Sequence, residues 1–191
     1  MFEFKFLNNS PEELDRFTKE VLDKIVACSG TRRKQLYRKG HGVSEPNDCF
    51  SITYGYCNLG YISKTKTRKR VEGLAHTYET SYLTLHPELK PILQEFCDLY
   101  CSEKIKVSQV QINKNYQIPP HKDSGNVGES WLVGLGDYTG GETIVEYDDE
   151  HIEYNINKKF VKFNGSKYTH WSKPFDGCRY SLVFYNHKLE K

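Results

Sequence analysis

Residues 121–142 read "HKDSGNVGESWLVGLGDYTGGE", in which a histidine and an aspartate one residue apart precede a strand-like run that ends on two glycines. Residues i and i+2 of an extended segment project from the same face, so His121 and Asp123 present an imidazole and a carboxylate to one point. These are two of the three ligands of a 2-His-1-carboxylate site, which holds non-haem Fe(II) and leaves coordination positions open. The stretch therefore predicts a metal site beside a β-rich region.

The third ligand and an anion-binding arginine are expected further along the chain. His170, in "KYTHW", is the candidate third ligand, and Arg179 follows it by nine residues at the start of "RYSLVFY". 2-Oxoglutarate chelates iron through one end, and its distal carboxylate then needs a rigid cation, for which a guanidinium is suited. Ser181, on the same face as Arg179, and Tyr116, before the metal motif, are further candidate contacts to this co-substrate. Each motif alone is common, but the set in this order is rare by chance, and it predicts Fe(II), 2-oxoglutarate and O2 as cofactors.

The chain changes its hydrophobic period at about residue 104, from helical to alternating. Before that point a helix is expected to begin at Ser10 and to end at Ser29-Gly30, and a second one follows Pro87, with "CFSITYGY" as a candidate strand between them. After it, short runs are separated by Gly, Asp and Asn turns, which favours a β-sandwich or barrel with helices packed on one sheet. The expected strands lie in "KIKVSQVQINKN", "SWLVGLGDY", "GETIVEY", "HIEYNI", "KFVKFN", "KYTHW" and "CRYSLVFYNH".

Composition predicts a soluble intracellular protein, nuclear or cytoplasmic. Of the 191 residues, 37% are hydrophobic, which is enough for a packed core, and no apolar run is long enough to cross a membrane. The N-terminus lacks the pattern of a signal peptide, and the six cysteines form no disulfide framework, which is typical of a reducing compartment. Charge is uneven, because residues 31–70 contain ten Lys or Arg and two acids, although the whole chain carries only +2.

These motifs together resemble the Fe(II)/2-oxoglutarate-dependent oxygenases. The resemblance rests on residues 121–142 and on "KFVKFNGSKYTHWSKPFDGCRYSLVFY", and it covers about residues 105–188. More narrowly, the sequence is similar to the ten-eleven-translocation and J-binding-protein branch, which oxidises the 5-methyl group of pyrimidines in nucleic acid. The resemblance implies a mainly β fold, a double-stranded β-helix or jelly roll, flanked by two or more helices. One domain over 1–191 is expected, with a jelly-roll core over 104–188 and helical, loop-rich support over 1–103.

The resemblance also implies which residues face the substrate. In base-oxidising members the target base is flipped out of the helix, and the positions matching Asn126 and His187 lie near it. Both side chains can hydrogen-bond a pyrimidine edge, although Asn126 could equally close its turn and His187 could lie in a frayed C-terminus. The basic run "KTKTRKR" is a candidate phosphate-binding segment, unless it is only a solvated loop or a localisation signal. Its basic residues are Lys64, Lys66, Arg68, Lys69 and Arg70.

The expected function is thus hydroxylation of a C–H bond, first of all the 5-methyl group of thymine or 5-methylcytosine, with DNA favoured over RNA as partner. One alternative is the same chemistry on a protein side chain, as in prolyl or lysyl hydroxylases. Another is a catalytically silent jelly-roll module that binds nucleic acid or protein. Four polar groups converging inside a barrel speak against the silent module, because burying them without a ligand is costly.

Overall fold

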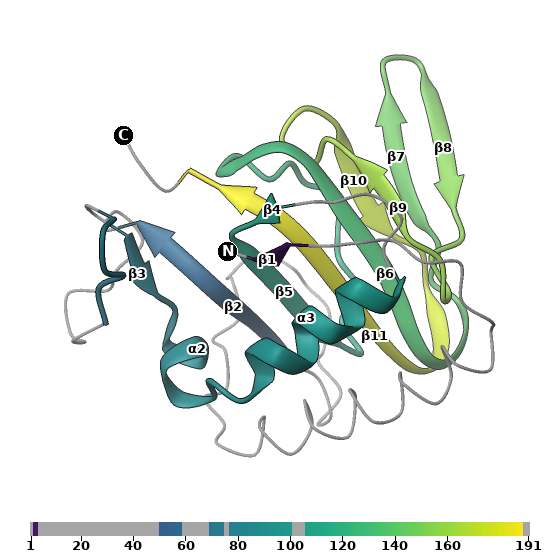
Figure 1. The fold of residues 1–191 in the computed structure, drawn as a ribbon. Coiled ribbons are helices and arrows are strands. Elements are labelled where there is room, and N and C mark those ends of the chain that lie inside the picture. The colour runs from purple at the N-terminus through teal and green to yellow at the C-terminus, as the bar shows by residue number, and fades with distance from the viewer. Residues whose placement is uncertain (1, 4–49, 59–68, 75–76, 101–105, 189–191) are drawn as a thin grey trace.

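The structure is a computed structural model that describes residues 2–3, 50–58, 69–74, 77–100 and 106–188. Within these residues the fold is mainly antiparallel β-sheet, with two short helices on one side (Figure 1). Strand β1 (Phe2–Glu3) pairs with β4 (Lys106–Val107) as a small separate sheet. The expected first helix, which begins at Ser10 and ends at Ser29-Gly30, lies outside the described residues.

The larger sheet has six strands in the order β3-β2-β5-β11-β6-β9. Its centre is β11 (Phe175–His187), which pairs with β5 (Gln109–Lys114) on one side and β6 (Asn126–Gly140) on the other. The outer strands are β2 (Phe50–Asn58), β3 (Thr77–Glu79) and β9 (Val161–Phe163). Because β2 pairs with β5, the sheet includes a strand from the first 103 residues and is not built by residues 104–188 alone.

The smaller sheet has three strands in the order β10-β7-β8. These are β10 (Thr169–Ser172), β7 (Thr143–Tyr147) and β8 (Glu150–Tyr154). Buried residues of both sheets, among them Leu132 of β6 and Val145 of β7, form one apolar cluster against which Val183 of β11 packs. The two sheets therefore enclose a common interior, as expected for a jelly roll.

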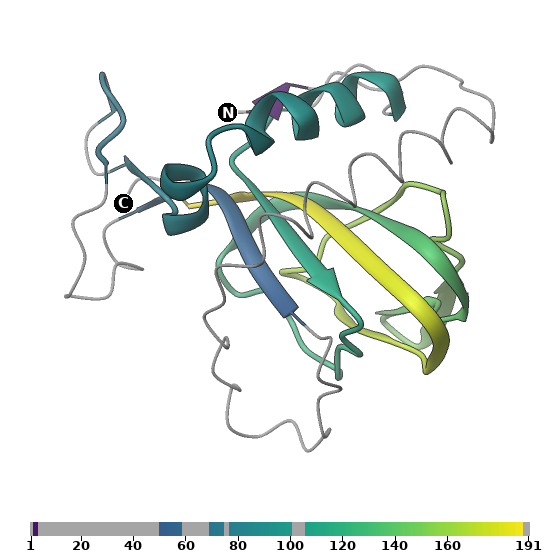
Figure 2. The same cartoon turned by 90° about the horizontal axis from the view of Figure 1, so that it is seen from below.

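The opposite face of the larger sheet is covered by helices. Helix α2 (Ser81–Leu85) begins after Thr80, whose side chain caps it, and α3 (Leu89–Tyr100) follows Pro87 as the sequence predicts. Leu89 and Leu93 of α3 are fully buried in the main core with Leu182 and Phe184 of β11. Figure 2 shows α3 running across this face of the sheet. Alternate residues of β11 thus face the helix on one side and the jelly-roll interior on the other.

The expected fold class is confirmed, and strands occupy all the segments named for them from residue 106 onward. One local expectation differs. His121 and Asp123 do not lie in a regular strand: His121 forms an isolated bridge with His170, and Asp123 precedes a turn. None of the described helices is long and apolar enough to cross a membrane.

Candidate metal centre

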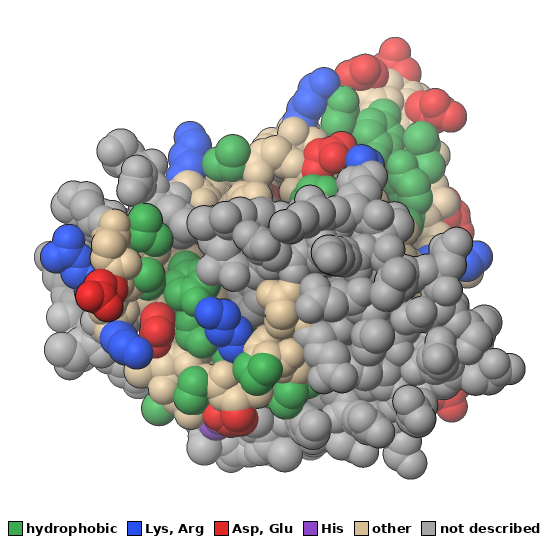
Figure 3. Space-filling view, viewed as in Figure 1, with side chains coloured by type: hydrophobic (Ala, Val, Ile, Leu, Met, Phe, Trp, Pro, Cys, Tyr) green, Lys and Arg blue, Asp and Glu red, His purple; other side chains and the backbone are tan. Residues whose placement is uncertain are grey.

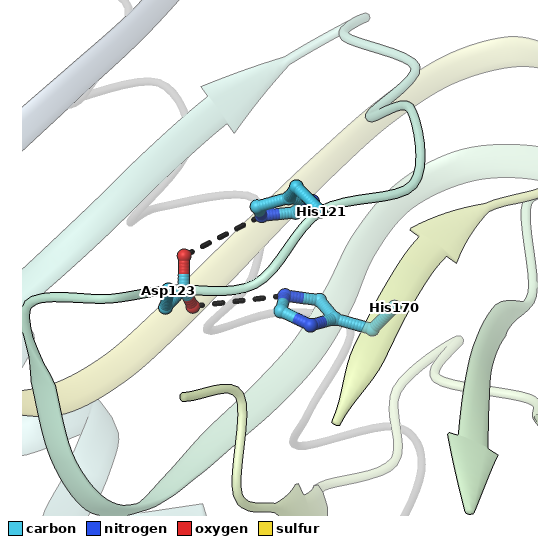
Figure 4. A group of neighbouring side chains, drawn as sticks. All are labelled: His121, Asp123 and His170. Atoms are coloured by element: carbon cyan, nitrogen blue, oxygen red, sulfur yellow. Dashed lines mark ion pairs between the residues drawn. The ribbon is translucent and has the colours of Figure 1, made fainter. Parts of the chain in front are cut away.

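His121, Asp123 and His170 converge on one point (Figure 4). Their candidate ligand atoms all lie within 4.8 Å of one another. The two carboxylate oxygens are shared between the rings: Oδ1 is 3.4 Å from Nε2 of His121, and Oδ2 is 3.6 Å from Nε2 of His170. Two imidazole nitrogens and a carboxylate at this spacing are the donor set of a facial triad.

Backbone hydrogen bonds join the two distant segments that carry these side chains. His121 and His170 exchange both backbone hydrogen bonds, with N···O distances of 3.1 and 3.0 Å. The Asp123 N–H donates to the carbonyl of Gly165 at 2.8 Å, so the same loop also holds the aspartate. The irregular segment after β5 is therefore fixed to β10 at His121, and to the loop before β10 at Asp123.

Both imidazoles are oriented by main-chain carbonyls. Nδ1 of His121 lies 2.9 Å from the Pro119 carbonyl, and Nδ1 of His170 lies 3.1 Å from the Tyr168 carbonyl. A carbonyl can only accept, so each Nδ1 carries a proton, and each Nε2 faces the shared centre. This arrangement around histidine ligands is typical of metal sites.

The pKa values of the two histidines are shifted in opposite directions. Burial alone would lower the pKa of His121, but the hydrogen bond and charge of Asp123 outweigh it, and the pKa is raised. For His170 burial lowers the pKa, and the neighbouring His121 lowers it further. The lowered pKa favours the neutral form of His170, which is the form that binds a metal. Its ring also packs edge-on against Phe163, at 4.8 Å between centroids, which keeps it in the interior.

Gly165 lies beside the candidate metal ligands, whereas its position in the sequence indicated only a turn. A Cβ built on it would lie 2.9 Å from Oδ2 of Asp123 and 3.2 Å from Cε1 of His170. Any side chain at this position would enter the metal centre. The signal in the sequence, a glycine in an "NGS" turn before the third ligand, is too common to identify this role without the fold.

Asn126 and His187 are direct partners in the β6–β11 ladder. Nδ2 of Asn126 donates to Oδ2 of Asp123 at 3.1 Å, so Asn126 steadies the carboxylate as well as ending its turn. His187 is the last residue of β11, and its N–H donates to the Ser108 hydroxyl at 2.9 Å. Their substrate contacts remain predictions.

Arg179 is 2% exposed and makes no ion pair within the described part of the chain. Its Nη2 donates to the Gly141 carbonyl at 3.1 Å, and its Nε has no partner. The rings of Tyr138 and Phe175 lie 5.6 and 5.3 Å from the guanidinium carbon. Burial lowers the pKa of Arg179, yet a guanidinium stays charged in proteins. Tyr138 and the charge of Glu142 oppose this lowering of the pKa, but neither forms an ion pair with Arg179 in the described part of the chain. A buried cation without an ion pair indicates a site for an anion.

The backbone around Arg179 is held by Asn115. The Arg179 N–H donates to Oδ1 of Asn115 at 2.9 Å, and the Asn115 N–H donates to the Arg179 carbonyl at 2.8 Å. Asn115 has φ +49°, a conformation that asparagine tolerates better than most residues. The adjoining Tyr116, predicted to contact the co-substrate, is half-buried, and its role remains a prediction.

Two glycines make room for the arginine and its neighbour Tyr138. A Cβ on Gly141 would lie 2.8 Å from Nε of Arg179, and one on Gly134 would lie 2.1 Å from the Tyr138 hydroxyl. That hydroxyl is buried and makes no hydrogen bond of good geometry within the described residues, although burial raises its pKa and the nearby Arg179 partly offsets this. Tyr138 is therefore a second buried polar group near the arginine, and the sequence did not single it out.

Of the basic segment, only Lys69 and Arg70 are described, and both are exposed. Lys69 lies 3.7 Å from Glu79 of β3, and Arg70 forms an isolated bridge with Tyr78. Lys64, Lys66 and Arg68 lie outside the described residues. Figure 3 shows acidic side chains among the basic ones at the β3 end of the molecule, so the described surface there is mixed in charge.

Comparisons of the fold and the sequence give different results. No family model matches the sequence, and no curated protein matches it either. Among solved structures, NgTET1 in complex with 5mC DNA is 17% identical, with a TM-score of 0.54, covering 95% of this chain and 70% of that one. A 2OG-Fe(II) oxygenase-family oxidoreductase from Burkholderia pseudomallei is 16% identical, with a TM-score of 0.47, covering 95% and 92% of the two chains. A prolyl hydroxylase from Trichoplax adhaerens, in complex with a hypoxia inducible factor peptide, is 11% identical, with a TM-score of 0.46, covering 97% and 82%.

The class that fold and geometry define is a double-stranded β-helix with a His-Asp-His cluster at its interior. The likeness to NgTET1 confirms, at the level of the fold, the resemblance drawn from the sequence.

Proposed function

We propose that this chain is an Fe(II)- and 2-oxoglutarate-dependent dioxygenase that hydroxylates a C–H bond. The observation that carries the proposal is the pairing of two features in one interior. One is a His-Asp-His cluster whose two Nε2 atoms face the Asp123 carboxylate at a shared point, and the other is a buried arginine that forms no ion pair with a described residue. The first feature suits Fe(II), and the second suits the distal carboxylate of 2-oxoglutarate.

Both features face the same space. The His170 ring packs on Phe163, which belongs to the cluster that Val183 joins. Val183 lies four residues after Arg179 on β11, so their side chains project from the same face. A molecule that binds metal at one end and carries an anion at the other can therefore engage both groups from between the sheets.

In this proposal His121, Asp123 and His170 hold the iron, and Arg179 anchors the co-substrate carboxylate with Ser181 beside it. Iron with 2-oxoglutarate and O2 supplies the oxidising chemistry, and the protein supplies placement and exclusion of water. Asn126 orients Oδ2 of Asp123, and the carbonyls of Pro119 and Tyr168 keep both imidazoles in the ligating tautomer. The Tyr138 hydroxyl is available as a further donor to the anion.

As substrate we propose the 5-methyl group of a pyrimidine in nucleic acid, with DNA favoured. Three features support it: the sequence resemblance to the base-oxidising branch, the basic segment, and the adjacent polar pair Asn126 and His187 near the metal residues. Exposed Arg70 and the neighbouring basic residues would contact phosphates. A protein side chain is the competing substrate, and the experiment below decides between them.

The test is O2-dependent succinate formation with Fe(II) and 2-oxoglutarate, run in parallel with DNA, RNA and peptide pools. Nucleosides and peptides from each reaction are then analysed by mass spectrometry for a gain of one oxygen. Asp123→Ala is the inactive control, and it should fold with a melting temperature close to that of the parent. Succinate formation by Asp123→Ala at the parental rate would refute the metal assignment, and oxygen gain only in peptides would refute the nucleic-acid substrate.

A further inference from the structure

A chain of hydrogen bonds crosses the inner face of β2, β5 and β11. The Thr53 hydroxyl donates to Oε1 of Gln111 at 2.7 Å, and Nε2 of Gln111 donates to the Ser51 hydroxyl at 2.6 Å. The Ser51 hydroxyl donates to Oδ1 of Asn113 at 2.6 Å, and Nδ2 of Asn113 donates to the Ser181 hydroxyl at 3.2 Å. The strand register explains the contacts, since Ser51 and Ser181 both pair with Asn113, and Thr53 pairs with Gln111.

All four hydrogen bonds of this series run in the same direction, from Thr53 toward Ser181. Thr53 and Ser51 donate toward amide oxygens, and Gln111 and Asn113 donate onward through their amide nitrogens. An amide has its acceptor and its donors on different atoms, so reversing one bond would require turning every side chain in the chain. The four bonds therefore share one direction, and such chains polarise their members cooperatively.

The chain ends on a proton that no described residue accepts. Ser181 accepts from Asn113, which occupies one lone pair and leaves its own O–H to donate elsewhere. Ser181 is 1% exposed and lies two residues after Arg179, on the same face of β11. The end of the chain therefore lies beside the one described arginine that is buried without a counter-charge, whose Nε is also unpartnered.

We propose that Asn113 is a positioning residue for the co-substrate anion, and that Gln111, Ser51 and Thr53 support it. By donating to the Ser181 oxygen, Asn113 directs the Ser181 proton toward the carboxylate held by Arg179. The other members hold the Asn113 amide in the orientation that makes this possible. This inference rests on the proposed function, because it takes 2-oxoglutarate as the anion.

The inference also explains the polar character of this part of the interior. The helix-facing side of the same strands is apolar, with Ile52, Val110 and Ile112 buried in the main core. On the inner side Asn113 is 3% exposed, a burial that side-chain amides rarely reach unless their hydrogen bonds are satisfied. The two amides and three hydroxyls on this side of the strands would all serve to orient one donor, the Ser181 hydroxyl.

The chain further connects the anion site to a more accessible surface. Asn113 and Ser181 are buried, whereas Ser51, Thr53 and Gln111 are half-buried. Changes at the accessible end are therefore transmitted to the anion site with decreasing strength. Thr53→Val, which removes the first donor without changing the shape, should weaken the anion contact less than a change at Asn113.

The experiment is calorimetric titration of 2-oxoglutarate into the full chain loaded with Mn(II), which needs no turnover. Ser181→Ala should weaken binding about tenfold or more, the effect of a lost hydrogen bond to a charged group. Asn113→Ala should weaken it about threefold to tenfold, because Ser181 remains but its proton is no longer directed. Asn113→Asp should weaken it more than Asn113→Ala, because the new carboxylate accepts the Ser181 proton and repels the anion.

The decisive comparison is the double variant. If Asn113 acts through Ser181, Ser181→Ala with Asn113→Ala should bind within about twofold of Ser181→Ala alone. Ile112→Val, on the helix-facing side of the same strand, is the matched control for loss of stability and should bind as the parent does. Parental binding by Asn113→Ala, or fully additive losses in the double variant, would overturn the inference and leave the proposed function standing. A parent protein that binds Mn(II) but no 2-oxoglutarate would overturn both.

Discussion

Gly165→Ala tests the metal centre with the smallest change the site allows. The added methyl would lie 2.9 Å from Oδ2 of Asp123 and 3.2 Å from Cε1 of His170. The backbone of Gly165 is outside the left-handed region, so alanine introduces no strain of its own there. The carboxylate or the imidazole must therefore move by several tenths of an ångström.

The consequence for metal binding follows from the tolerance of metal–ligand distances, which is about 0.2 Å. Displacements of ligands by neighbouring residues typically cost about tenfold to a hundredfold in metal affinity, and we expect Gly165→Ala to lie in this range. Stability should change much less, because overpacking costs about 1–3 kcal/mol and the stiffer unfolded chain returns about 0.4–1 kcal/mol. Metal affinity and stability are therefore affected unequally.

The assay is titration of Mn(II) and Co(II) by calorimetry, with thermal melting of the metal-free protein alongside. Gly128→Ala is the control, since its Cβ meets nothing within 4 Å but its φ of +74° strains alanine. It should lose stability and keep parental metal affinity. Parental metal affinity in Gly165→Ala, or an equal loss in Gly128→Ala, would show that the three side chains do not form the binding site.

Three further predictions follow from the same geometry. Arg179→Met should leave the melting temperature of the metal-free protein unchanged or raised, because a buried charge without an ion pair is removed. Thermal stabilisation by 2-oxoglutarate should disappear in this variant. A large loss of stability would show that the charge of Arg179 is already balanced in the parent. Asn126→Ala should lower Mn(II) affinity about tenfold, because Oδ2 of Asp123 loses its donor; unchanged metal affinity with a raised KM for nucleic acid would assign Asn126 to the substrate alone. Arg70→Ala should reduce the salt dependence of DNA binding by about one unit of slope per lost phosphate contact, measured by anisotropy between low and high salt, and an unchanged slope would remove Arg70 from the interface.

The sequence predicted those parts of the site that depend on residue type and on spacing along the chain. The three residues that converge, His121, Asp123 and His170, could be named because few residue types supply those donors, and because short strands between them allow a return to one point. Arg179 was named on the same grounds, and its role stays a prediction. The second helix and the later strands followed from period alone. The pairing of β2 with β5 could not be predicted this way, because register between segments over fifty residues apart leaves no local signal.

The residues that sequence reasoning missed act on space or orientation and not as ligands. Gly165 and Gly141 matter because a methyl group there would meet Asp123 or Arg179, and only the folded chain brings those atoms near. Asn113 and Asn115 matter through hydrogen bonds to residues 68 and 64 positions away. Both asparagines stand in "INKNY", which reads locally as the end of a strand and its turn.

Burying a cation and several uncharged polar side chains lowers the stability of a fold unless those groups are paired. The two faces of the larger sheet differ in this respect. The face that packs on the helices is lined by the residues of the main hydrophobic core. The inner face carries the buried Arg179, which forms no described ion pair, and the hydrogen-bonded amides and hydroxyls. A scaffold kept only for binding at its outer surface would gain stability from apolar residues at these inner positions. Their presence on the interior side, which the His-Asp-His cluster also faces, supports the proposal that a small anionic molecule is bound and used inside the barrel.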